Sequence, residues 1–150
     1  MTILSKAQEV KINYNDSNLL MSTWNKFIQA IDNSDRKTIK SLSKDSVECY
    51  CGNDSIESDR PIWAVDSFSR LIISYFETNL KLNKIVKTET PQLIANRVDW
   101  VKNKPEIIYS LVYVLYKPNE IAPGHEGGSI FFEFNKIKNK FVFRSISTVP

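Results

Sequence analysis

The spacing of apolar residues changes once along this chain, near residue 80. Before that point apolar side chains mostly recur every three or four residues, and after it they alternate. The first spacing is typical of helices and the second of strands. Helices followed by consecutive strands predict an α+β fold in which helices cover one face of an antiparallel sheet. The chain shows no internal repeat and no linker, so we expect one domain over residues 1–150, with 1–15 loosely ordered.

Three segments have helical spacing. The first places five apolar side chains on one face, namely Leu20, Trp24, Phe27, Ile28 and Ile31. Asp16 or Ser17 is its expected N-cap. A second helix is predicted over residues 34–44, capped by Ser34. The third is predicted over 62–80, where Asp59 and Pro61 occupy typical N-cap and first-turn positions.

The strands are predicted from alternation and from turn residues. A short strand covers VECYC, residues 47–51. Four or five strands follow the third helix, over 84–90, 92–101, 106–117, 127–135 and 140–149. The only histidine, His125, lies in the stretch APGHEGG between two of these strands. Proline and glycines there favour a hairpin tip, and the adjacent Glu126 is poorly placed to orient a catalytic imidazole.

Two segments of the sequence resemble a known superfamily. FIQAIDNSDRKTIKSLSKDSVECY (27–50) and SIFFEFNKIKNKFVFRSIST (129–148) are similar to the nuclear transport factor 2-like superfamily, which includes SnoaL cyclases and ketosteroid isomerases. The resemblance implies a cone-shaped, cystatin-like roll in which three N-terminal helices pack on a curved antiparallel sheet. It is a resemblance of fold, and one fold hosts many functions.

Helices that cross a curved sheet can leave a cavity between them. The aromatic side chains expected in this space belong to the core, and some of them are candidates for lining a ligand cavity. These candidates are Trp24, Phe27, Phe68, Tyr75, Trp100, Tyr113, Phe132, Phe134 and Phe143.

The carboxylates that are candidates for a catalytic base occur in two strands. In the strand predicted over 92–101, alternation places Val98 and Trp100 on one face. Arg97 and Asp99 lie on the other face. If the last hairpin has an even loop, Glu133 faces Arg144 on the outer side of the sheet, together with Phe131 and Ile146.

Metal, redox and cofactor motifs are few. Cys49 and Cys51 are expected to be reduced strand residues, too far apart for an easy disulfide. Two cysteines and one histidine cannot complete a structural zinc site. No phosphate loop, nucleophile elbow or dinucleotide glycine motif occurs, so we expect no metal and no cofactor.

The surroundings of the protein are indicated by its charge and hydropathy. We see no signal peptide and no membrane-spanning run, so we expect a cytoplasmic protein. A net charge of +3 without a dense basic stripe argues against nucleic acid as a partner. EIIYSLVYVLY (106–116) is apolar on both faces, which predicts a homodimer through the sheet.

Two functions remain open at this point. The first is a small non-catalytic binding or protein-interaction protein with an aromatic-lined cavity, for instance one that neutralises a toxin. The alternative is an isomerase, dehydratase or cyclase acting on a small hydrophobic carbonyl compound. It would need Asp99 or Glu133 inside the cavity with a raised pKa, whereas a binding protein allows both to lie outside.

Overall fold

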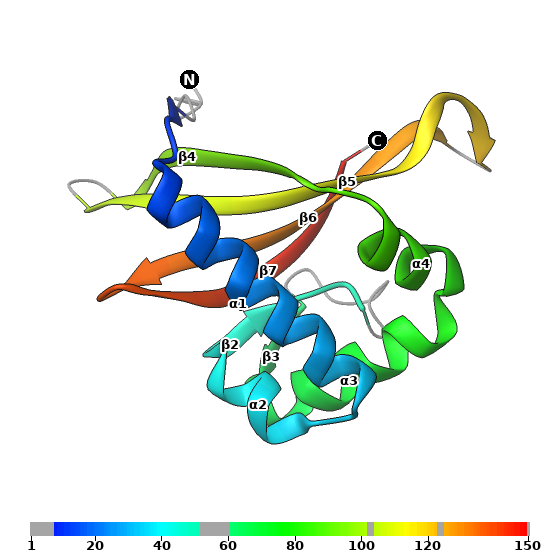
Figure 1. Ribbon diagram of the computed structural model, residues 1–150, viewed down its shortest axis with the longest axis horizontal. Coiled ribbons are helices and arrows are strands. Elements are labelled where there is room, and N and C mark those ends of the chain that lie inside the picture. The colour runs from blue at the N-terminus through cyan, green and yellow to red at the C-terminus, as the bar shows by residue number, and fades with distance from the viewer. Residues whose placement is uncertain (1–7, 52–60, 102–103, 123–124, 150) are drawn as a thin grey trace.

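The computed structural model describes residues 8–51, 61–101, 104–122 and 125–149. Over this part of the chain four helices lie against a curved seven-stranded sheet, which confirms the predicted α+β class (Figure 1). The helices are α1 (Tyr14–Asp32), α2 (Arg36–Ser41), α3 (Val65–Thr78) and α4 (Leu80–Thr88). The strands are β1 (Gln8–Val10), β2 (Ser43–Glu48), β3 (Ile62–Ala64), β4 (Gln92–Val101), β5 (Lys104–Ala122), β6 (His125–Ile137) and β7 (Lys140–Val149).

The order of strands in the sheet is β1-β4-β5-β6-β7-β2-β3. Neighbouring strands are antiparallel except β2 and β7, which run parallel. The last four strands follow one another as hairpins, and the bounds of β4 and β7 are those predicted from alternation. β5 and β6 extend further than expected, to a final pair of Ala122 and His125. His125, which was predicted to lie in the loop, is the first residue of β6 and pairs with Ala122.

The first two helices begin at other residues than predicted. Asn13, not Asp16 or Ser17, caps α1, because its side-chain oxygen accepts a hydrogen bond from the Asp16 amide at 2.8 Å. Asp35 caps α2 in the same way through the Thr38 amide. Ser34, the predicted cap, instead has a φ of 52°, in the left-handed turn that joins the two helices.

The third predicted helix is divided by sheet pairing. Residues 62–64 form β3 beside β2, so that Trp63 pairs with Val47 and the helix starts only at Val65. Asp59, its predicted cap, lies outside the described residues. The predicted strand at 84–90 is wrong: this segment belongs to α4, in which Leu82 and Val86 are buried at a helical spacing of four.

The last hairpin contains a β-bulge that the sequence-based register did not include. From Ile137 and Lys140 to Phe134 and Phe143 the strands pair as predicted, but Glu133 then pairs with Ser145. Arg144 is the extra residue on β7, so every later side chain of this strand changes face. Ile146 was predicted to lie outside; it pairs with Phe132 and is buried in the core.

Candidate functional site

Most of the predicted cavity residues pack against one another. Six are at most 1% exposed, namely Trp24, Phe27, Phe68, Phe132, Phe134 and Phe143. The Trp24 ring lies 4.5 Å from Phe132 and 5.8 Å from Phe27, measured between centroids. Contacts at these distances are those of a packed aromatic core.

The three remaining candidates differ from this group. Tyr113 is 2% exposed, and its hydroxyl accepts a hydrogen bond from Trp24 Nε1 at 2.8 Å. Tyr75 is half-buried on α3 and lines a surface hollow beside Cys51. Trp100 lies in β4, but its side chain is outside the described part of the chain. Most of the residues predicted from the sequence to line a cavity thus belong to one packed core. That a ligand binds among them stays a prediction.

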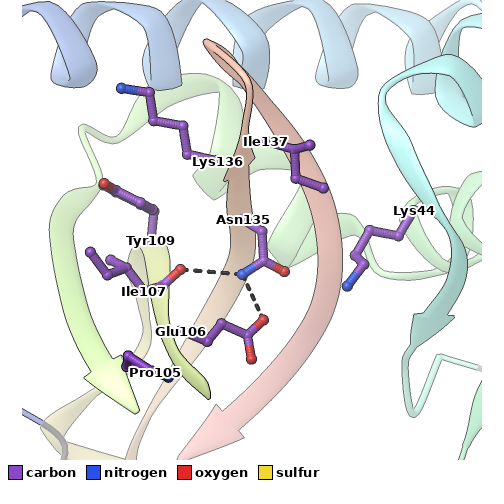
Figure 2. A pocket seen from close by; sticks show the side chains of 8 residues that line it. All are labelled: Lys44, Pro105, Glu106, Ile107, Tyr109, Asn135, Lys136 and Ile137. Carbon is purple, nitrogen blue, oxygen red and sulfur yellow. Dashed lines mark hydrogen bonds between the residues drawn. The ribbon is translucent and has the colours of Figure 1, made fainter. Parts of the chain in front are cut away.

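A hollow of about 470 Å³ opens between two hairpins of the sheet. Down to the pair Tyr109 and Phe134, strands β5 and β6 lie side by side. Beyond it, β5 continues along β4 and β6 along β7, so the hairpins diverge like the arms of a fork (Figure 1). We call this space the fork hollow. It is lined by Lys44, Pro105, Glu106, Ile107, Tyr109, Asn135, Lys136 and Ile137 (Figure 2).

A polar network connects the two arms of the fork. Asn135 on β6 is 7% exposed, and its Nδ2 donates to Glu106 Oε1 at 2.8 Å and to the Ile107 carbonyl at 3.2 Å (Figure 2). Arg144, the bulge residue of β7, forms an ion pair with the same Glu106 oxygen and donates to Asn135 Oδ1 at 3.3 Å. One amide and one guanidinium thus replace backbone pairing where the strands separate.

Lys136, one of the residues that line the hollow, contacts the start of α1. Lys136 Nζ lies 2.9 Å from Asp16 Oδ1, and this hydrogen bond raises the pKa of the lysine ammonium. Burial raises the pKa of the nearby Tyr109 hydroxyl, and the negative charge of Asp16 adds to the effect. Both groups therefore keep their protons at neutral pH.

Lys44 provides the remaining charge of the lining. It lies on β2, which runs parallel to β7, and its side chain points toward Glu106 and Asn135 in Figure 2. Within the described part of the chain Lys44 has no ion-pair partner, whereas Lys136 is paired with Asp16 and Arg144 with Glu106. The hollow therefore carries one uncompensated positive charge between apolar walls that include Ile107 and Ile137.

The two carboxylates considered as bases lie away from the aromatic core. Asp99 is exposed on β4. Glu133 alternates with Phe132 and Phe134 and so points to the outer face, where its Oε1 accepts from Ser145 at 3.1 Å and Ser147 at 3.0 Å. Its predicted pairing with Arg144 is wrong because of the bulge. Glu106 and Asn135 were not identified from the sequence, since their proximity depends on where the hairpins diverge.

The prediction of reduced cysteines is also wrong. Cys49 and Cys51 form a disulfide with a Cα separation of 5.2 Å. An extended strand would place alternate Cα atoms roughly 6.6 Å apart. Strand β2 ends at Glu48, before both cysteines, and the chain bends enough to bring them within bonding reach.

Two further observations concern membranes and metals. Among the described helices, none is long and apolar enough to cross a bilayer. Within the same described ranges, no three histidine, cysteine, aspartate or glutamate side chains gather as a metal site would require.

Comparisons with solved structures found similar chains at low sequence identity. A designed NTF2-like protein is similar with a TM-score of 0.45 and 8% identity, over 89% of this chain and 100% of that chain. DUF4783 family proteins from Bacteroides fragilis and Bacteroides ovatus are similar with TM-scores of 0.36 and 10% identity, each over 82% of this chain and over 93% and 90% of theirs. No protein-family model and no curated protein matches the sequence.

Proposed function

We propose that this protein is a non-catalytic binding protein and that the fork hollow binds a small organic anion with an apolar part. The observation that carries this proposal is the Lys44 ammonium, which has no ion-pair partner among the described residues and lies beside a hollow whose other charges are paired. A carboxylate or phosphate would pair with Lys44, and its apolar part would contact Ile107 and Ile137. Pockets of this kind use apolar walls for affinity and a few polar groups for orientation.

The positions and contacts of the candidate carboxylates support ligand binding rather than catalysis. A base in an apolar cavity was the main requirement of the isomerase or dehydratase alternative. Asp99 is exposed, and Glu133 lies on the outer face with two serine hydroxyls. Glu106 is the acid in the fork hollow, and it is engaged by Arg144 and Asn135.

The binding proposal can be tested with straight-chain carboxylates from acetate to octanoate. We expect calorimetry to show affinity that rises with chain length, because each added methylene buries apolar surface. Lys44→Gln should weaken octanoate binding about tenfold, the effect of losing one charge-assisted contact. Lys26→Gln is the matched control, since Lys26 is exposed on α1 and is not part of the lining.

Two results would count against the fork hollow as the ligand site. One is an equal loss of octanoate affinity in the Lys44 and Lys26 variants, which would indicate non-specific attraction to a basic protein. The other is affinity that does not depend on chain length, because the apolar walls would then have no role.

A second observation favours a homodimer through the outer face of the sheet. This face carries apolar side chains that are only partly buried, namely Ile94, Val112, Phe131 and Val142. The helices cover the opposite face, which holds the aromatic core. We propose that a second copy of the chain packs here, and a protein partner such as a toxin is the competing occupant.

A further inference from the structure

The disulfide between Cys49 and Cys51 joins residues that are already close in the chain. Only Tyr50 separates them, and the sequence contains no third cysteine. A disulfide stabilises a fold mainly by closing a loop in the unfolded chain, and it does so more for longer loops. This bridge closes the loop of a single intervening residue, so cross-linking accounts poorly for its presence.

The two cysteines are held in different ways. Cys49 is 1% exposed; its amide donates to the Pro61 carbonyl at 2.9 Å, and its carbonyl accepts from Trp63 Nε1 at 2.8 Å. Cys51 is only partly buried. Cys51 is therefore the more accessible of the two cysteines, while Cys49 is enclosed inside the protein.

A second hollow, of about 350 Å³, lies beside Cys51. We call it the α3 hollow because α3 supplies most of its wall. It is lined by Tyr50, Cys51, Leu71, Ser74, Tyr75, Thr78 and Asn79. Hydroxyl and amide groups predominate in this lining, beside the apolar Leu71, which suits the polar backbone of a short peptide.

We propose that the Cys49–Cys51 bridge is a thiol–disulfide exchange site for a small peptidyl thiol bound in the α3 hollow. The substrate thiolate attacks Sγ of Cys51, a substrate–Cys51 disulfide forms, and the bond to Cys49 breaks. Cys49 leaves with the electron pair and takes up a proton. A second substrate thiolate then attacks the substrate sulfur and releases the Cys51 thiolate, so that two thiols are oxidised to a disulfide and the bridge is reduced to a dithiol.

Two general properties of disulfides agree with this role. In the cytoplasm, the location expected from the sequence, disulfides are usually transient and either catalytic or redox-sensing. Exchange with a thiolate also depends on which sulfur is attacked and on its accessibility, and Cys51 is the more accessible cysteine of this bridge. The inference is independent of ligand binding in the fork hollow, because the two hollows share no lining residue.

The exchange can be tested with glutathione as the peptidyl thiol. The oxidised protein is incubated with reduced glutathione, quenched with acid, alkylated and digested for mass spectrometry. We expect one glutathione in a mixed disulfide with Cys51, and the alkylating reagent on the thiol of Cys49. With oxidised glutathione, Cys49→Ala, which leaves Cys51, should form a mixed disulfide at least ~10-fold faster than Cys51→Ala, because accessibility controls the rate.

Several outcomes would overturn the proposal. Glutathione on Cys49, or equal rates for the two single variants, would remove the assigned role of Cys51. Two thiols that stay reduced in oxidised glutathione would show that the bridge does not form. A bridge that resists glutathione, and whose reduction by a strong reductant lowers the midpoint of thermal unfolding, would be a structural cross-link; we expect that midpoint to be unchanged.

Discussion

Arg144 forms its ion pair with Glu106 of β5 and not with Glu133, the residue that an unbroken β6–β7 ladder would place opposite it. The bulge at Arg144 causes this exchange of partners, since it shifts the pairing by one residue and leaves Glu133 opposite Ser145. The guanidinium then reaches across β6 to the strand that diverges from it. The bulge that shifts the register of β7 therefore also decides the charged partner of Glu106, a residue that lines the fork hollow.

Replacement of Arg144 by Met should lower the free energy of unfolding by about 1–3 kcal/mol. The reason is that Glu106, with 32% of its side chain exposed, would lose its charged partner and keep only Asn135. Arg70→Met is the control, because Arg70 is 66% exposed in its pair with Asp66 and should change the value by less than about 0.5 kcal/mol. Urea denaturation measures both, and equal effects would show that the network at the fork contributes nothing specific.

Tyr113→Phe should destabilise the protein by about 1–3 kcal/mol, because it leaves the buried Trp24 Nε1 without an acceptor. The substitution removes one oxygen and keeps the ring, so packing changes little. Tyr14→Phe is a matched control at a position that is 79% exposed, and its effect should stay within about 0.5 kcal/mol. If denaturant unfolding gives the same stability for both variants, the Trp24–Tyr113 bond is not a significant part of the core.

Stability should fall in alkaline solution because of three tyrosines. Burial is the main cause that raises the pKa of Tyr75, Tyr109 and Tyr113 above the ordinary value of 10.0. The folded protein keeps these protons where the unfolded chain has already lost them, so their contribution is fully present below pH 10 and is lost as the pH rises through the folded pKa values. Unfolding free energies measured across this range should fall less steeply for Tyr113→Phe than for Tyr14→Phe. Parallel curves would contradict the assignment.

Phe131→Asp should convert a homodimer into a monomer, because it places a charge among the apolar residues of the outer face. Light scattering after size exclusion should then give 17.3 kDa per particle, against twice that mass for the unsubstituted protein. Leu19→Asp, at a partly exposed position on α1, should leave the dimer intact. An unsubstituted protein of 17.3 kDa at micromolar concentration would refute the dimer, and a particle containing a different chain would identify a protein partner.

The elements with strong periodicity were predictable residue by residue. β4 and β7 have the bounds that alternation gives, and the buried face of α1 carries Leu20, Trp24 and Phe27 as predicted. α4 was misread because its isoleucine and valine favour strands in general, while its buried positions are spaced for a helix. The candidate site was not predictable, since Lys44, Glu106 and Asn135 come from three strands and meet only where the sheet divides.

Local periodicity was enough to predict the α+β class, the consecutive strands and the aromatic side chains that form the core, because it shows which side of an element is apolar. Periodicity gave no sign of the bulge at Arg144, the divergence of the two hairpins or the bond between Cys49 and Cys51. These features depend on how the chain bends and on which residues of distant segments pair. A shift of one residue in that pairing changes which side chains share a face and leaves the sequence pattern of each strand unchanged.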